Sequence, residues 1–275
     1  MSLRINTNLA SINAQRSLSN TGQVKSEAMR ALASGSRITQ AADDAAGLSI
    51  SENLRATDRS NRMAKRNAED AISFIQVGEG GLNEVNNILV RMRELATQSA
   101  SDTIGDTERE FIGQEVDQLM QEIDRIAEST NFGDKNLLNG TLEAMEFQVG
   151  TDGSENSIIR FDSSPDATAS SLGVSSLDMD DKYSARDAME VIDEALTQVG
   201  SMRSNFGALQ NRLDSTIANL DVSHESMSAA NSRIRDADIA AETAKLTSAQ
   251  VLEQASIGML AQANQSTAQA LKLVG

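Results

Sequence analysis

The sequence has no cysteine, no tryptophan, one tyrosine and one proline in 275 residues. Without cysteine, disulfides and thiolate chemistry are excluded. Aromatic residues make up only 3% of the chain, so the bulky side chains that usually supply buried area are scarce. The core must therefore be built from smaller aliphatic side chains, which suits long helices packed closely together. Because Pro165 is the only proline, almost nothing in the sequence would break a helix.

The net charge of −16 argues against nucleic acid and anionic membranes as partners, because both require clustered Lys and Arg. The charge is unevenly distributed. Residues 1–45 carry five basic and three acidic side chains, and residues 236–275 carry two and four. The two ends are therefore neutral together, and residues 46–235 hold the whole negative charge. Such ends can pack against copies of themselves without a charge penalty.

The last nineteen residues, IGMLAQANQSTAQALKLVG (257–275), contain a single charge, Lys272. Chain ends usually fray in water, so an apolar end is unusual. The stretch is long enough to span a bilayer, but its Gln and Asn side chains make insertion costly, and we expect none. The start of the chain has no apolar core of signal-peptide length. We expect this C-terminal end to be covered when copies of the chain come together.

A heptad repeat runs from Ile50 to Ala96, with apolar residues at eleven of fourteen positions in two columns. A second repeat is apolar in every heptad. Its column consists of Ile192, Val199, Phe206, Leu213, Leu220, Met227 and Ile234. Sustained seven-residue repeats are typical of coiled-coil-like seams. We expect a bend in the first long helix only at Gly78–Gly81, where glycine weakens the helix.

Shorter elements surround these two helices. Helical patterns cover residues 3–38 and 238–273, and a further helix follows residue 107. Alternating apolar residues before and after residue 152 predict one β-hairpin, and the Ser- and Asp-rich segment 162–181 predicts an exposed loop. The expected fold is mainly α: a long antiparallel coiled-coil-like bundle, or rod, with the hairpin at one end and both termini at the other.

No motif in the sequence predicts an enzyme, a cofactor or a metal site. His224 is the only histidine, and no nucleophile accompanies it. The acidic segment 178–181 lacks the glycine and closing glutamate of a calcium loop, and GEGG at 78–81 lacks the Lys of a phosphate loop. The periodicity by itself is compatible with two functions. One is self-assembly through the helical ends, and the other is a soluble coiled-coil rod that binds a partner.

Several long motifs are more specific. LRINTNLASINAQRSL (3–18), SGSRITQAADDAAGLSISENLRA (34–56), EIDRIAESTNFGDKNLLNG (122–140) and SRIRDADIAAETAKLTSAQVLEQASIGMLAQANQ (232–265) closely resemble segments of bacterial flagellins, in the same order. The resemblance covers almost all of 1–162 and 184–275. Because large variable outer domains are missing, the chain is similar to a short flagellin with D0 and D1 domains only. Hook–filament junction proteins share part of the terminal pattern, and a junction or coiled-coil adaptor protein is the alternative.

The resemblance implies a structural subunit that self-assembles into the flagellar filament for swimming. Residues 1–45 and 236–275 would pair as a D0-like coiled coil in the filament core. Residues 46–235 would form a D1-like rod, with a β-hairpin near 142–162 and a short loop at 163–183. Flagellins are exported through the flagellar type III apparatus, so the resemblance implies a secreted, extracellular protein. Its implied partners are copies of itself, an export chaperone, hook-junction and filament cap proteins, and an animal Toll-like receptor.

The resemblance also implies two sets of contact residues. Polymerisation and chaperone binding are expected at apolar side chains of the terminal helices: Ile5, Leu9, Ile12, Leu252, Met259, Leu260, Leu271 and Leu273. Contact with a receptor or a second subunit is expected at Arg91, Arg93, Leu95 and Glu115. Arg91 and Leu95 are spaced as neighbours on one helix face.

Overall fold

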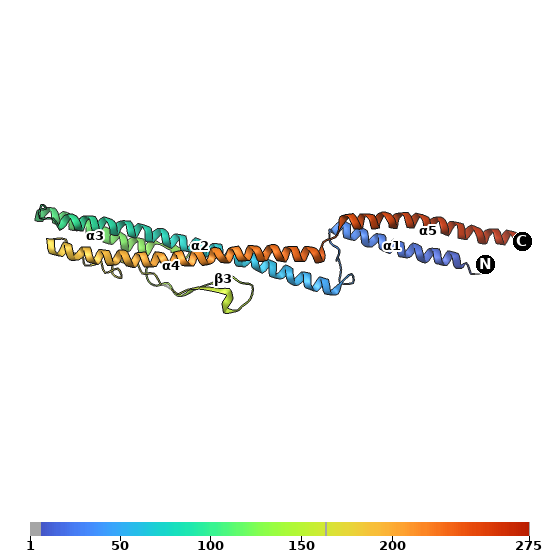
Figure 1. The fold of residues 1–275 in the computed structure, drawn as a ribbon, viewed down its shortest axis with the longest axis horizontal. Helices are drawn as coiled ribbons and strands as arrows, with labels where there is room; N and C mark the ends of the chain where they lie inside the picture. The colour runs from blue at the N-terminus through green and yellow to red at the C-terminus, as the bar shows by residue number, and fades with distance from the viewer. Residues whose placement is uncertain (1–6, 163, 275) are drawn as a thin grey trace. The chain divides into compact units, whose positions relative to one another are not determined.

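The computed structural model describes residues 7–162 and 164–274, without the side chains of 267–274. Over these residues the α-helices are α1 (Leu9–Ser34), α2 (Ala45–Ser99), α3 (Asp106–Ser129), α4 (Lys182–Arg235) and α5 (Ile239–Val274) (Figure 1). The chain divides into two compact units, and the division falls inside α2 and α4. One unit consists of residues 1–58 and 225–275, and the other of residues 59–224. The predicted class, mainly α with antiparallel helices, is confirmed.

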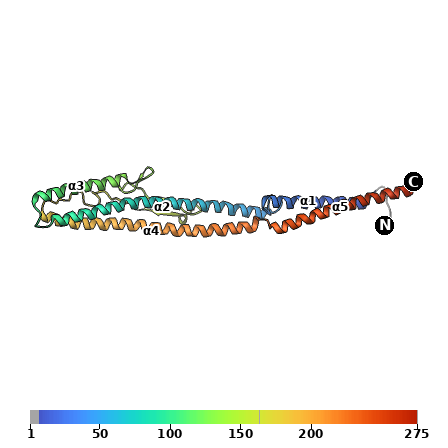
Figure 2. The same cartoon turned by 90° about the horizontal axis from the view of Figure 1, so that it is seen from above.

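The unit formed by residues 59–224 is built around the two predicted heptad seams. In α2, both heptad columns are buried from Asn61 to Ala96, and in α4 the column is buried from Ile192 to Leu213. Helix α3 lies along α2, on the side away from α4 in Figure 2. Ion pairs join the three helices at their surfaces: Arg91 lies 2.9 Å from Glu115 of α3, and Arg93 lies 2.5 Å from Asp193 of α4.

Five of the six phenylalanines of the chain gather in one place in this unit, whereas Phe111 and Tyr183 are exposed. The Phe74 ring lies edge-on to those of Phe132, Phe147 and Phe161, with centroids 5.9, 5.8 and 6.4 Å away. Phe161 also stacks on Phe206 of α4, at 5.3 Å. Edge-on and offset ring pairs add about 0.5–1.5 kcal/mol each beyond the buried area. These five phenylalanine rings therefore pack α2, α4 and the strands against one another at one position.

The predicted hairpin is formed by β3 (Met145–Gln148) and β4 (Ile158–Phe161), paired with Phe147 opposite Ile159. Its expected position at one end of the bundle was wrong. The Asn67 side chain on α2 donates to the Gln148 carbonyl at 2.9 Å, and Phe147 packs on Phe74, so the hairpin lies against the sides of the helices. A second, shorter hairpin pairs β1 (Asn131–Phe132) with β2 (Lys135–Asn136), where the sequence pattern suggested only a turn.

The segment after the hairpin is not the exposed loop that its composition predicted. It contributes buried side chains to the core: Pro165, Ala167, Ala169, Leu172, Val174 and Met179. Its backbone is also fixed, because the Ala167 amide donates to the Leu138 carbonyl and the Ala169 amide to the Asp124 side chain, both at 2.8 Å. Small side chains let this segment lie close to α3, and tertiary contacts outweigh its polar composition.

Helix α2 is continuous through Gly78–Gly81, where a bend was expected. Two of the three glycines there, buried Gly78 and half-buried Gly81, serve close packing. A β-carbon at Gly78 would lie 3.0 Å from the Phe206 ring, and one at Gly81 would lie 2.7 Å from Leu138 and from Thr130. Gly80, on the exposed side, has nothing within 4 Å. Gly78 and Gly81 therefore leave room for side chains of other elements to pack against α2, and they do not interrupt the helix.

Candidate functional site

The unit formed by residues 1–58 and 225–275 contains an antiparallel pair of helices, α1 and α5, side by side in Figure 1. The seam between them is made of small residues. Ala14, Ala28 and Ala31 of α1 are buried, and so are Ala249, Ser256 and Ala263 of α5. The three seam residues of α5 recur every seven positions, which keeps them on one face. Small side chains let the two helices approach closely but bury little apolar area.

Polar contacts fix the alignment of this helix pair. The Asn8 side chain caps α1 by accepting from the Ser11 amide at 3.1 Å, and it also donates to the Ala263 carbonyl at 2.9 Å. Further along the pair, the Lys25 ammonium lies 2.8 Å from the Glu253 carboxylate. These contacts determine which side chains face the seam and which face outward.

Many of the large apolar side chains of the pair face outward, whereas Leu18, Leu32, Leu246 and Leu260 are half-buried. Leu9, Ile12, Leu252 and Met259 are between 44% and 60% exposed, and Val251, Ile257, Met29 and Ile239 are exposed as well. Met259 also borders an open groove between the two helices, together with Ala10, Ala14 and Ala263. In a stable monomeric helix pair the large aliphatic side chains face the seam. Here small residues fill the seam, and much of the apolar surface of the pair is left in contact with water.

The structure places most of the predicted contact residues of the terminal helices. Leu9, Ile12, Leu252 and Met259 lie on this exposed surface, and Leu260 is half-buried. Ile5 lies outside the described residues, and the side chains of Leu271 and Leu273 are also outside them. Sequence reasoning missed the seam residues, although the seven-residue spacing of Ala249, Ser256 and Ala263 was a visible signal.

A connection of residues 35–44 joins this helix pair to α2 within the same unit. Gly35 ends α1 with a positive φ of 66°, and its carbonyl accepts from the Ala237 amide at 2.9 Å. The Arg37 guanidinium donates to the Ile234 carbonyl at 2.9 Å. Asp43 accepts from the Thr39 amide and hydroxyl and from the Gln40 amide. These hydrogen bonds, those of Thr39 foremost, lower the pKa of Asp43 to about 2. The connection is thus a defined structure tied to the end of α4.

The second predicted set of residues lies on the other unit. Arg91 and Glu115 form a half-exposed ion pair between α2 and α3, and Glu94 also binds Arg91. The hydrogen bond to Glu115 raises the pKa of Arg91 further above its ordinary value. Arg93 points instead to Asp193 on α4. Leu95 was expected on the same contact surface, but it is only 2% exposed and belongs to the core. The exposed part of this surface therefore consists of paired charges.

Among the described residues, no group of three or more His, Asp and Glu side chains lies where it could hold a metal ion. The helices of residues 7–162 and 164–274 include none with the length and apolar character needed to cross a membrane.

Two family models match the chain. The bacterial flagellin N-terminal helical region matches residues 5–143, and the bacterial flagellin C-terminal helical region matches residues 189–274. This chain belongs to the bacterial flagellin family. Between the matched regions lie only residues 144–188, which include the β3–β4 hairpin and the packed segment before α4. The protein is therefore a short flagellin, and the prediction from its motifs is confirmed.

Curated relatives match this flagellin along almost its whole length. A flagellin of Halalkalibacterium halodurans is 44% identical over 274 residues, which cover 98% of this chain and 99% of the relative. A flagellar filament core protein of Brachyspira hyodysenteriae is 41% identical over 285 residues, with the same coverage of 98% and 99%. The crystal structure of Bacillus cereus flagellin is similar with a TM-score of 0.50 and 32% identity, over 56% of this chain and 88% of that one. Like these relatives, this flagellin is a structural filament subunit.

Proposed function

We propose that this flagellin polymerises into the filament through the outward apolar faces of the α1–α5 pair, with Leu9, Ile12, Leu252 and Met259 as contact residues. The observation that carries the proposal is the helix pair itself, with small residues in its seam and many large aliphatic side chains in water. Burying one such side chain stabilises by about 1.5–3 kcal/mol. A single chain cannot gain this energy, but neighbouring copies that cover the faces can.

Charge supports the same surface. Residues 1–45 and 236–275 are neutral together, while the rest of the chain is strongly acidic. We assign these two ranges to a D0-like part that packs inside the filament, and residues 46–235 to a D1-like part. Copies that join head to tail without closing form a filament, so one such contact repeated along the polymer is sufficient. We also propose Ile5, Leu260, Leu271 and Leu273 as contact residues for polymerisation.

The exposed surface also implies how the chain is handled before assembly. Exposed apolar surface of the kind that α5 presents favours aggregation, so we propose that an export chaperone binds residues 236–275. Export through the flagellar type III apparatus then places the protein outside the cell. Hook-junction and cap proteins would meet the same terminal helices at the two ends of the filament. The role is structural and non-catalytic.

A receptor contact at Arg91, Arg93 and Glu115 is a separate proposal. These side chains are half-exposed and already paired within the chain. An animal Toll-like receptor would therefore meet preformed ion pairs, with Leu95 supporting them from the core. Such a surface is also available for subunit contact in the filament.

Leu252→Asp in the full chain tests the polymerisation surface. Because Leu252 is largely exposed in the single chain, the substitution should leave helical circular dichroism unchanged. In the polymer it would bury an unpaired charge, which is strongly unfavourable. Electron microscopy of samples seeded with filament fragments should show filaments for the unchanged chain and for the control Leu252→Met, and none for Leu252→Asp. Filaments of Leu252→Asp would exclude this face. If the unchanged chain formed only a discrete complex with a flagellar partner, a junction or adaptor function would replace the proposal.

A further inference from the structure

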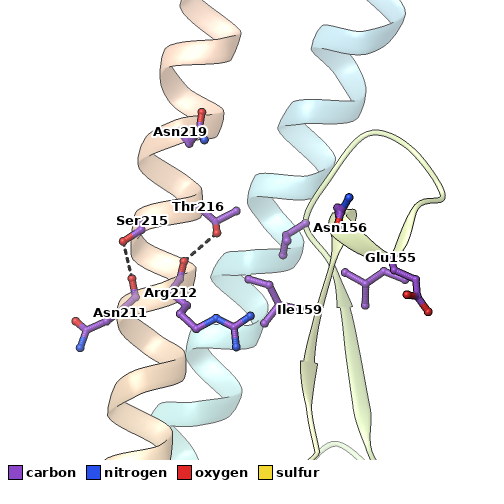
Figure 3. A pocket seen from close by; sticks show the side chains of 10 residues that line it. Glu155, Asn156, Ile159, Asn211, Arg212, Ser215, Thr216 and Asn219 are labelled. Atoms are coloured by element: carbon purple, nitrogen blue, oxygen red, sulfur yellow. Dashed lines mark hydrogen bonds between the residues drawn. The ribbon is translucent and has the colours of Figure 1, made fainter.

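An open groove of about 820 Å³ lies between α4 and the β3–β4 hairpin, within the unit formed by residues 59–224 (Figure 3). One wall is the exposed face of α4, with Asn211, Arg212, Ser215 and Asn219. The other wall is the hairpin, with Asn156 and Ile159. The hairpin therefore does not cover this part of α4. The polymerisation proposed through α1 and α5 does not involve this groove.

The hydroxyl groups along the groove are already engaged. The Ser215 hydroxyl donates to the Asn211 carbonyl and the Thr216 hydroxyl to the Arg212 carbonyl, each at 2.8 Å, as the dashed lines in Figure 3 show. Both bonds stay within α4, so neither hydroxyl has a hydrogen left to donate to a group that enters the groove. The donors that remain are the Arg212 guanidinium, which points toward the hairpin in Figure 3, and the side-chain amides of the asparagines.

Arg212 differs from several other cations on the helices of this unit. Arg91, Arg93 and Lys65 each contact a carboxylate of another helix, at 2.9, 2.5 and 2.7 Å. In the described part of the chain, the Arg212 guanidinium has neither an ion pair nor a hydrogen bond. The acidic residue in the groove lining, Glu155, lies 3.5 Å from Arg160 on the hairpin. The groove thus presents one unpaired cation flanked by neutral amides.

We infer that this groove receives a carboxylate side chain from a second copy of the chain, which pairs with Arg212 in the filament. The inference rests on the proposed polymerisation and adds a second contact to it. Charge complementarity selects the occupant: the chain has 40 Asp and Glu against 24 Lys and Arg, so the surface of a neighbouring copy is rich in carboxylates. A guanidinium binds a carboxylate through two parallel hydrogen bonds, and adjacent amides can donate to the same oxygens. The volume of the groove is sufficient for a side chain that enters from outside.

The first test converts the arginine to an amine that can be trapped. In Arg212→Lys, a water-soluble carbodiimide activates a nearby carboxylate, and the introduced amine displaces the activating group to form an amide. We expect this amine to be joined to an acidic residue of another chain in filaments and not in dilute monomer, as identified by mass spectrometry. The matched control is Arg125→Lys, whose partner Glu122 lies in the same chain. It should give a cross-link within one chain in both states.

The second test uses the unchanged chain. Phenylglyoxal modifies accessible guanidinium groups, and Arg212 should react in the monomer and become protected in filaments. Equal reactivity of Arg212 in the two states overturns the inference, and so does a cross-link of the Arg212→Lys variant that stays within its own chain. Protection without any cross-link would also overturn it, because a group other than a carboxylate would then cover the groove. If the unchanged chain forms no filaments, polymerisation itself fails as the function. A failure of this contact alone would leave filaments intact.

Discussion

The side chain of Arg109 completes the end of helix α2. It is buried, and its guanidinium donates to the Ser99 and Ser101 carbonyls, both at 3.0 Å. The last carbonyl groups of a helix have no partner within the helix, and a cation there is also favoured by the helix dipole. We predict that Arg109→Met, which keeps an unbranched side chain but removes the guanidinium, lowers the free energy of unfolding by about 1–3 kcal/mol. The Ser99 carbonyl then loses this donor, and the Ser101 carbonyl keeps only the Ile104 amide, at 3.3 Å.

Urea unfolding of the full chain measures this effect. The matched control is Arg125→Met, because Arg125 is exposed and pairs with Glu122 one helical turn away. Exposed pairs of this kind contribute about 0–1 kcal/mol. An Arg109 variant as stable as the control would mean that water satisfies the two carbonyls equally well.

Asp43 gives a residue-scale prediction on pH. Its pKa of about 2 lies below the ordinary value near 4 because Thr39 and Gln40 donate to the carboxylate. A lowered pKa in the folded state means that the carboxylate favours folding above pH 4, and that this contribution disappears as pH falls through 2. In a carboxyl NMR titration we expect a midpoint near 2 for Asp43, moving upward in Thr39→Ala. A midpoint near 4 in the unchanged chain would show that the connection of residues 35–44 does not hold Asp43.

At the scale of one helix, two neighbouring glycines should respond oppositely to the same change. Gly80→Ala adds a β-carbon in open space and should stabilise by about 0.5–1 kcal/mol, because alanine favours the helix. Gly81→Ala brings that carbon 2.7 Å from Leu138 and Thr130, and overpacking of this kind costs about 1–3 kcal/mol. Thermal unfolding followed by circular dichroism should therefore give a higher melting temperature for the first variant and a lower one for the second. Two increases would mean that Thr130 and Leu138 move aside easily.

The same helix shows what could be predicted at the element scale. The long helices were predictable because each heptad repeats one short rule many times, and an error at one position does not disturb the pattern. The segment 164–181 has no such repetition. Its buried Ala167, Leu172 and Val174 are scattered among polar residues, and they are buried because Leu138 and Asp124 bind its backbone. Contacts between residues distant in sequence decide this fold, and a local pattern does not contain them.

The candidate surface was predictable for a different reason. The resemblance to flagellins implies Leu9, Ile12, Leu252 and Met259 as contact residues of the terminal helices, and the structure exposes them. The sequence does not show why they are exposed, since apolar residues on helices are normally buried. The reason is that Ala14, Ala28 and Ala249 occupy the seam in their place. Leu95 is the opposite case, an expected contact residue that is buried. Its spacing from Arg91 indicates that both lie on one helix face, but the spacing does not show that the core covers Leu95.

For the whole molecule, the distribution of charge predicts how assembly depends on salt. Residues 46–235 carry the net charge of −16, so copies that approach through the neutral ends still repel each other through their acidic parts. Raising sodium chloride from about 0.01 to about 0.15 M shortens the screening length from about 30 to about 8 Å. We therefore expect the critical concentration for polymerisation, measured by sedimentation, to fall over this range and then level off.

Sodium sulfate at equal ionic strength should have the same effect if screening is the cause. A much larger effect of sulfate would instead identify apolar burial as the salt-sensitive step, since sulfate strengthens burial. A critical concentration that rises with salt would show that ion pairs between copies, such as the one proposed for Arg212, outweigh the repulsion.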